Sequence, residues 1–160
     1  MNKYVDHVQI VLEDDANREL VNGFLRHHAV DVHRFGISPP SGGWLKVLEE
    51  FESYHIKQLR KFDLRRVVLI IDFDGKFEER IERLKGRVPE DLLDRVFILG
   101  TGIEPEALRA AMGMNLEAIG LKLAGDCASG EEVFWGHELL RHNLHEARRL
   151  NAATGYLFRE

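Results

Sequence analysis

Two short apolar runs constrain the fold more than any other feature of the sequence. They span residues 8–12 and 67–71, and one polar side chain, Gln9, interrupts them. A strand with one face in water alternates apolar and polar residues, whereas a strand buried on both faces is almost continuously apolar. Strand and helix patterns also alternate along the chain, as in wound α/β domains. The sequence therefore predicts a mainly parallel sheet with helices on both faces.

Periodicity and turn residues divide the chain into elements. The segment 38–43 contains two prolines and two glycines, which exclude both helix and central strand. Pro105 in a first turn and Gly113 at the end delimit one of the later helices. The expected strands are 6–12, 30–37, 67–72 and 95–99, and the expected helices are 16–28, 44–61, 77–84, 105–112, 116–124 and 131–150.

The chain has the size and composition of one domain. It has 160 residues, of which 44% are hydrophobic, enough for a sizeable core. No internal repeat, low-complexity stretch or linker divides it. We expect a single Rossmann-like α/β domain over residues 1–160, with about four strands. Its core should cover about 6–112, and a helical C-terminal extension about 115–155.

Nothing in the sequence predicts a membrane or secreted protein. The longest apolar runs have the length of strands, and residues 1–6 lack the basic and apolar regions of a signal peptide. We therefore expect a cytoplasmic protein without a membrane partner. The single cysteine, Cys127, has no partner for an internal disulfide or a cysteine zinc site, so we expect a buried small residue there.

The net charge is -5 with histidine neutral, which argues against a dedicated nucleic-acid-binding domain. Basic residues are nevertheless dense at 57–61 and 65–66, and again at Arg141 and 148–149. Solvated helix surface is the simplest interpretation of these groups, since basic residues are favoured at helix ends.

Three carboxylates follow the two apolar runs. Glu13 closes the first run, and Asp72 and Asp74 close the second. Ligands of wound α/β sheets bind at the carboxyl edge, which is where these acids are expected. In an extended chain Asp-x-Asp places both carboxylates on the same side. Crowded carboxylates repel one another unless a cation neutralises them, and hard oxygen ligands suit Mg²⁺ or Mn²⁺. The pattern predicts a divalent-metal site.

The same acids carry a resemblance to a known family. Glu at the end of the first strand, Asp-x-Asp at the end of a later strand and the intervening βα units resemble the Toprim domain of topoisomerases, bacterial primases, recombination proteins and overcoming-lysogenization-defect nucleases. The resemblance covers about residues 6–112. It implies that Glu13 is a general acid/base or metal-binding residue and that Asp72 and Asp74 bind metal. Glu104 is similar to a further acidic motif of the nuclease branch.

The resemblance implies phosphodiester hydrolysis of DNA or RNA with Mg²⁺ or Mn²⁺. Asp14, Asp15 or Glu104 would complete a second metal position. By analogy, a chain this short would be one nuclease subunit that works with a separate ATPase partner. One departure is clear, because family members commonly have Gly directly after the glutamate, and this chain has Asp14 and Asp15.

A second resemblance is to response-regulator receiver domains. Residues 10–20, with Glu13, Asp14 and Asp15, are similar to the opening of such a domain, whose acidic pair holds Mg²⁺ beside a phosphoaccepting Asp. Asp72 would then accept the phosphoryl group, Thr101 would be the switch hydroxyl and Lys122 would contact the phosphate. This alternative fits less well, since Lys122 falls in a segment that is expected to be helical.

A purely structural interpretation stands beside both. Asp14 and Asp15 are acids of the kind favoured in the first turn of a helix, and Asp72 and Asp74 are common turn and cap residues. In that case the chain would be a non-catalytic interaction module. The structural interpretation weakens when the acids are taken together, because Glu13 and Asp72 end different strands that converge in a wound fold.

Two further polar features are weaker. His137 and His142 lack the i, i+4 spacing of a zinc-binding helix, so we expect Glu138 and His142 to be solvated or to form an inter-helix hydrogen bond. The segment 38–43 is expected to form a loop over the carboxyl edge, and Trp44 after it to be a core or interface anchor.

Overall fold

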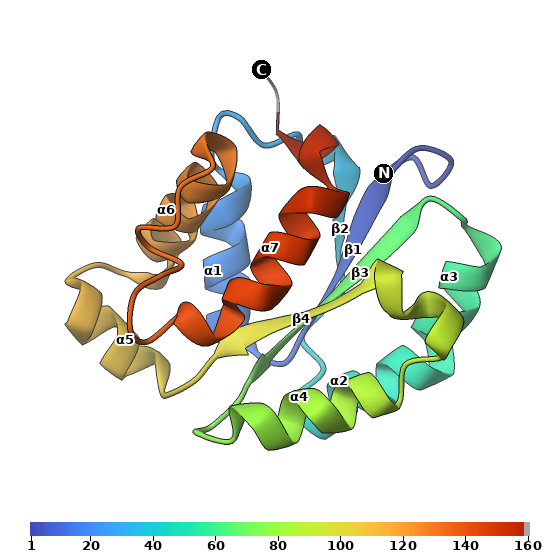
Figure 1. Cartoon of the computed structure of the whole chain (residues 1–160), viewed down its shortest axis with the longest axis horizontal. Helices are drawn as coiled ribbons and strands as arrows, with labels where there is room; N and C mark the ends of the chain where they lie inside the picture. The colour runs from blue at the N-terminus through green and yellow to red at the C-terminus, as the bar shows by residue number, and fades with distance from the viewer. Residues whose placement is uncertain (159–160) are drawn as a thin grey trace.

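Four parallel strands form one sheet in the order β2-β1-β3-β4 (Figure 1). The structure is a computed structural model and describes residues 1–158 of the chain. The strands are β1 (His7–Leu12), β2 (Phe35–Ile37), β3 (Arg65–Asp72) and β4 (Val96–Thr101). Each hydrogen-bonded pair of strands is parallel. The predicted α/β class, with a parallel four-stranded sheet, is confirmed.

The strand order reverses between β1 and β3. The chain passes from β1 to β2 on one side and then returns to form β3 on the other side of β1. Crossovers that leave the sheet in opposite directions open a crevice at the carboxyl ends of the two central strands. Leu12 of β1 is paired with Ile70 of β3, so the residues that follow each strand meet at this switch point.

Helices cover both faces of the sheet (Figure 1). One face carries α1 (Asp15–Leu25), α6 (Leu116–Ser129) and α7 (Leu144–Ala153). The other carries α2 (Trp44–Glu50), α3 (Ile56–Lys61) and α4 (Phe77–Gly86). The short helix α5 (Pro105–Met112) follows the carboxyl end of β4. The segment expected as a C-terminal extension therefore supplies two of the three helices on one face.

Successive residues of each central strand enter different cores. Val8, Ile10 and Leu12 pack against α1, α6 and α7, whereas Val11 packs with the helices of the opposite face. Val8, Val11 and Leu12 are completely buried. This burial on both faces explains why the apolar runs lack the alternation of a half-exposed strand.

Several helix boundaries agree with the sequence and one helix contains an irregular turn. The Asp14 carboxylate accepts a hydrogen bond from the Asn17 backbone and caps α1, which ends at Leu25 rather than at residue 28. The helix expected at 44–61 is continuous, but a π-helical turn at Phe51–His55 separates α2 from α3. Gly113, with φ of 64°, ends α5 as expected.

The strand expected at 30–37 is wrong in its first half. Only Phe35–Ile37 forms β2, and Val32–Arg34 is a 3-10 helix that the Asp31 side chain caps. Val30 instead makes an isolated antiparallel bridge with Phe158. Local capping by Asp31 thus outweighs the apolar character of the segment.

The two C-terminal helix predictions also need correction. Helix α6 continues through Gly125 and ends at Gly130, which has φ of 73°. The helix expected from residue 131 starts only at Leu144, after a 3-10 helix at Arg141–Asn143. The buried Asp126 carboxylate accepts hydrogen bonds from the backbone N–H groups of Phe134 and Trp135, at 2.6 and 3.1 Å. These contacts hold the segment between α6 and α7 in turns instead of a helix.

Glycines allow α1 and α6 to cross closely. A Cβ atom on Gly120 would lie 1.9 Å from the carbonyl oxygen of Leu20, and one on Gly23 would lie 1.9 Å from the carbonyl oxygen of Glu117. Real Cβ atoms do not approach carbonyl oxygens so closely, so both positions require glycine at this helix separation.

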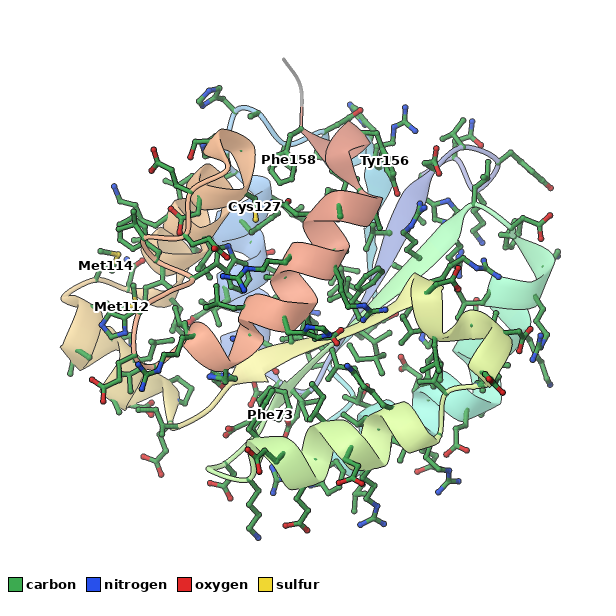
Figure 2. The ribbon with its side chains drawn as sticks, in the orientation of Figure 1. Phe73, Met112, Met114, Cys127, Tyr156 and Phe158 are labelled. Carbon is green, nitrogen blue, oxygen red and sulfur yellow. The ribbon has the colours of Figure 1, made fainter. Side chains whose placement is uncertain are left out.

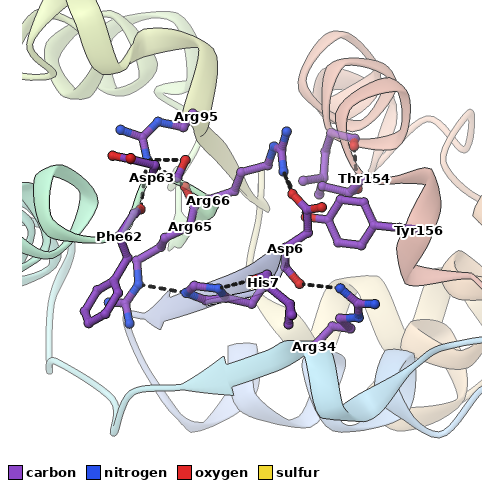
Figure 3. Close-up of polar contacts among 12 residues, drawn as sticks. Asp6, His7, Arg34, Phe62, Asp63, Arg65, Arg66, Arg95, Thr154 and Tyr156 are labelled. Atoms are coloured by element: carbon purple, nitrogen blue, oxygen red, sulfur yellow. Dashed lines mark hydrogen bonds and ion pairs between the residues drawn. The ribbon is translucent and has the colours of Figure 1, made fainter. Parts of the chain in front are cut away.

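Polar contacts hold the amino edge of the sheet (Figure 3). Arg65 is 2% exposed, and its Nε donates to Nε2 of His7 at 3.0 Å. His7 uses its other ring nitrogen to bond the carbonyl of Val5 at 2.7 Å. Arg66 forms an ion pair with Asp6 at 3.2 Å. The expectation of solvated helix surface is therefore wrong for Arg65 and Arg66, which lie on β3.

Among residues 1–158, no helix is both long enough and apolar enough to cross a membrane.

Candidate functional site

Glu13 and Asp72 meet at the switch point. The backbone N–H of Glu13 bonds the carbonyl of Ile70 at 3.0 Å, which extends the β1–β3 pairing beyond Leu12. The Glu13 side chain then reaches across the end of β3, and its Oε2 accepts a hydrogen bond from the backbone N–H of Asp72 at 2.6 Å. Both residues are half-buried. The structure thus brings together the two acids that end different strands.

Asp72 begins a tight turn that carries Asp74 away from the strand. Its Oδ1 accepts a hydrogen bond from the backbone N–H of Asp74 at 2.8 Å. Asp74 has φ of 48° and Gly75 has φ of 72°, so the chain is no longer extended. The side chain of Asp74 is 69% exposed. The period-two argument for Asp72 and Asp74 is therefore wrong, because the strand ends at the first of the two acids.

Arg80 is a site residue that the sequence analysis did not identify. It projects from α4, its Nη1 donates to the Asp72 carbonyl at 2.6 Å, and its Nη2 lies 3.9 Å from Asp74 Oδ2. The guanidinium also lies over the ring of Trp44, 4.8 Å from the centroid, and Arg83 lies over the same ring at 5.4 Å. The Trp44 contact orders the Arg80 side chain beside the turn. No spacing in the sequence connects α4 with Trp44 or with Asp72.

Burial and mutual repulsion alter the acidity of the central pair. Burial raises the pKa of Glu13 above its usual value; the hydrogen bond from Asp72 opposes this, and the negative charges of Asp14 and Asp72 raise it further. Burial also raises the pKa of Asp72, and the negative charges of Asp74 and Asp14 raise it further. The hydrogen bond from the Asp74 N–H and the positive charge of Arg80 lower it. Negative charge at this edge is thus only partly compensated by the protein itself.

The donor set can be compared with the needs of a divalent cation. No group of three or more His, Cys, Asp or Glu side chains within residues 1–158 is arranged to hold a metal ion. Two carboxylate oxygens, Glu13 Oε1 and Asp72 Oδ2, accept no hydrogen bond from the described residues, while their partner oxygens each accept one. Mg²⁺ commonly binds through one or two carboxylates and keeps several waters. The pair matches that requirement in the number and type of its ligand atoms.

The other predicted acids have different positions. Asp14 forms a capping box with Asn17, since each side chain accepts from the other's backbone N–H, at 3.0 and 3.3 Å. Asp15 is 89% exposed in the first turn of α1. Glu104 is exposed at the N-terminal end of α5 and makes no capping hydrogen bond. The structural interpretation as helix-start residues therefore describes Asp14 and Asp15.

Of the residues that a receiver domain would use, Thr101 lies beside Asp72 but Lys122 lies far from it. Thr101 on β4 is paired in register with Asp72 on β3, as the resemblance to a receiver domain requires. Lys122 lies on α6 and borders a surface hollow with His27 and His28, which follow the far end of α1. Since α1 starts at the carboxyl edge and runs back along the sheet, Lys122 is near the opposite edge. The segment is helical, as expected from its sequence.

His142 and the loop at 38–43 complete the surroundings. The His142 Nε2 donates to the Gly100 carbonyl at 2.7 Å, and its ring packs edge-on against Phe73 and Phe77. Figure 2 shows Phe73 near the start of α4. Burial lowers the pKa of His142, which favours the neutral imidazole. The expectation that His142 is solvated or forms an inter-helix hydrogen bond is therefore wrong, because His142 bonds the backbone of β4.

The loop follows β1 beyond its end. The backbone N–H groups of Ser41 and Gly42 donate to the carbonyls of Leu12 and Glu13, at 2.9 and 2.8 Å. The Ser41 hydroxyl is buried and has no hydrogen-bond partner among the described residues. The expectation of a loop over the carboxyl edge is confirmed, and these hydrogen bonds hold the loop beside Glu13.

Comparisons of the chain with family models, with curated proteins and with solved structures return no match.

Proposed function

We propose that the protein is a Mg²⁺- or Mn²⁺-dependent phosphodiester hydrolase that acts on nucleic acid, alone or as the nuclease subunit of an assembly with an ATPase. The observation that carries the proposal is the pairing of Glu13 with Asp72 at the switch point, where one oxygen of each carboxylate accepts no hydrogen bond from residues 1–158. The resemblance to Toprim domains supports the reaction class, and the ATPase partner rests on that resemblance alone.

The protein residues have distinct roles in this proposal. Glu13 Oε1 and Asp72 Oδ2 would hold the ion, and the exposed carboxylate of Asp74 would join through rotation of its side chain. A bound divalent ion lowers the pKa of a coordinated water and neutralises charge on the scissile phosphate. Arg80, fixed by Trp44, holds the turn at the Asp72 carbonyl and adds positive charge beside it. Asp14 and Glu104 remain candidates for a second ion, whereas Asp15, exposed in the first turn of α1, is given no ligand role.

Charge around the pair supports a polyanionic substrate. Arg80 lies beside the turn, over the ring of Trp44, and Lys76 is exposed within the turn that follows Asp74. Cations near a carboxylate centre neutralise phosphates on either side of the reacting group. These residues make a nucleic-acid strand a better substrate class than a small phosphoester.

The decisive experiment is cleavage of labelled single-stranded and double-stranded DNA and RNA with Mn²⁺. We expect wild-type cleavage that EDTA abolishes, and loss of cleavage in Glu13→Gln and Asp72→Asn. Asp15→Asn is the matched control, because it removes an exposed carboxylate of the same edge. Cleavage that survives both substitutions would refute the proposed centre. Absence of cleavage in the wild type would leave the partner-dependent or non-catalytic alternatives.

One observation favours a phosphoacceptor role as a second candidate. Thr101 pairs with Asp72 in register and is 3% exposed, and its hydroxyl has no partner among the described residues. Incubation with a small phosphodonor, followed by mass spectrometry, tests this role. Phosphorylation that Asp72→Asn abolishes would support it over hydrolysis. The position of Lys122 counts against it.

A further inference from the structure

An apolar cavity lies between the sheet and the helices α1, α6 and α7. Its volume is about 110 Å³, and its walls include Ile10, Phe24, Trp135 and Ala147. Figure 2 shows Cys127, another wall residue, among these helices. Protein cores contain few voids larger than a water molecule, and an engineered apolar cavity of about 150 Å³ stays dry and binds benzene. The size and lining of this cavity therefore suit a molecule close to benzene in size.

One buried polar atom in the wall has no hydrogen-bond partner within residues 1–158. Thr101 lines the cavity from the same face of β4 as Phe97 and Leu99, and its Oγ1 makes no hydrogen bond to a described residue. The other buried polar side chains of the wall are satisfied. Asn143 bonds both backbone groups of Gly100, and the Thr154 hydroxyl donates to Leu150. A buried hydroxyl without a partner is unfavourable, so a ligand atom that bonds Thr101 would be stabilised there.

We propose that this cavity is a binding site for a small aromatic molecule that carries one hydrogen-bonding group, of the phenol type. The ring would occupy the apolar volume between Phe24, Trp135 and Ala147, and the polar group would pair with the Thr101 hydroxyl. The site is independent of the proposed hydrolase centre, because neither Glu13 nor Asp72 lines the cavity. Burial raises the pKa of Cys127 to about 11, so its thiol is neutral at pH 7 and adds no charge to the wall.

The two tryptophans give a direct test by nuclear magnetic resonance. The chain has two indole N–H groups, of which Trp135 borders the cavity and Trp44 lies on the opposite side of the sheet. Titration of ¹⁵N-labelled protein with phenol should shift the Trp135 resonance in a saturable manner and leave that of Trp44 unchanged. A Trp135 resonance that stays in place, or equal non-saturable shifts of both, would overturn the proposal.

A comparison of phenol with toluene tests the role of Thr101, since the two molecules have nearly the same shape. One net hydrogen bond corresponds to about a fivefold change in affinity. The ratio of phenol to toluene affinity should therefore fall about fivefold in Thr101→Val, which replaces the hydroxyl by a methyl group. An unchanged ratio in the folded variant would overturn the assigned pairing with Thr101.

A variant that fills the cavity tests whether phenol binds there. Ala147→Leu adds side-chain volume from α7 into the cavity and should abolish the phenol-induced shift of Trp135. Ala152→Leu, on the exposed side of the same helix, is the matched control and should bind phenol as the wild type does. If Ala147→Leu does not fold, Cys127→Leu fills the cavity from α6. Phenol binding that persists in a folded, filled variant would place the ligand elsewhere and refute the site.

Discussion

The carboxylate of Glu13 accepts a hydrogen bond from the backbone N–H of Asp72 at 2.6 Å, across 59 positions of sequence. The bond joins the ends of the two central strands at the point where the strand order reverses. It also fixes one oxygen of Glu13, while the other accepts no hydrogen bond from the part of the chain that the structure describes. The arrangement places negative charge where the crevice of a wound sheet opens, and two consequences for metal binding and pH can be measured.

Asp72→Asn should abolish stabilisation by Mg²⁺ while leaving the metal-free fold intact. The amide oxygen of Asn can still accept the hydrogen bond from Asp74, and the substitution relieves repulsion with Glu13 and Asp14. At a concentration of 100 times its Kd, an ion that binds only the folded state stabilises by about 2.7 kcal/mol. Urea unfolding with and without Mg²⁺ should show that gain in the wild type and in Asp15→Asn, but not in Asp72→Asn. Metal-free Asp72→Asn that does not fold would mean that Asp72 is a structural residue.

The metal-free wild type should become more stable, through this pair, when the pH is lowered from 7 toward 4. The folded-state pKa values of Glu13 and Asp72 are raised above those of the unfolded chain. Their favourable contribution is therefore fully present below the unfolded values, near 4, and is lost as pH rises through the folded values. The unfolding free energy of the wild type, measured relative to the Glu13→Gln, Asp72→Asn double variant, should therefore increase as the pH is lowered from 7 toward 4. A pH-independent difference would contradict the raised pKa values.

His7 should contribute in the opposite direction. It is completely buried, and burial, together with the charge of Arg65, lowers its pKa in the fold. The unfolded chain therefore binds a proton first as pH falls below about 6.5, and stability declines by about 1.4 kcal/mol per pH unit until the folded pKa is reached. His7→Gln should flatten the decline of unfolding free energy between pH 7 and 5, because an amide oxygen can accept from Arg65 without titrating. His33→Gln, at an exposed position, should keep the wild-type slope.

The sequence predicted the parts of the structure that depend on periodicity. The runs at 8–12 and 67–71 are buried on both faces, and the topology that such strands imply brings Glu13 to Asp72. What failed depends on local side-chain contacts. Asp31 caps a 3-10 helix where a strand was expected, Asp74 follows a turn that ends the strand, and Asp126 holds turns where a helix was expected.

The residues that were missed come from elements whose docking no pattern reveals. Arg80 reaches Asp72 because α4 packs beside Trp44, and His142 reaches Gly100 because the C-terminal segment returns along β4. Arg80 lies on a charged helix and His142 lies in a polar turn, and neither segment carries a sequence pattern that indicates its contact. Their positions follow from tertiary packing, which hydrophobic periodicity does not encode.

Gly120→Ala should destabilise the fold strongly. The added methyl group would lie 1.9 Å from the Leu20 carbonyl oxygen, so α1 and α6 would have to separate along their contact. Overpacking of this kind destabilises by about 3 kcal/mol. Gly86→Ala, at the end of α4 with no atom within 4 Å of the new methyl group, is the control and should be neutral or slightly stabilising. Chemical unfolding measures both, and equal stability of the two variants would show that the helices do not cross as closely as described.

Arg80→Ala should impair cleavage without preventing metal binding. Arg80 donates to the backbone carbonyl of Asp72 and lies 3.9 Å from Asp74, yet it bonds neither of the free carboxylate oxygens of the central pair. Loss of a fixed positive charge beside a reacting phosphate lowers kcat by about 10²-fold, as removal of one preorganised donor does in other enzymes.

Arg83→Ala is the matched control, because Arg83 also lies over the Trp44 ring but makes no contact with the acidic turn among the described residues. Single-turnover cleavage with Mn²⁺, together with Mn²⁺ affinity by calorimetry, should show a slow step with near-normal metal binding in Arg80→Ala and near-wild-type values in Arg83→Ala. Equal losses in both variants would assign the effect to general surface charge, and lost Mn²⁺ binding in Arg80→Ala would show that Arg80 acts only by holding the turn.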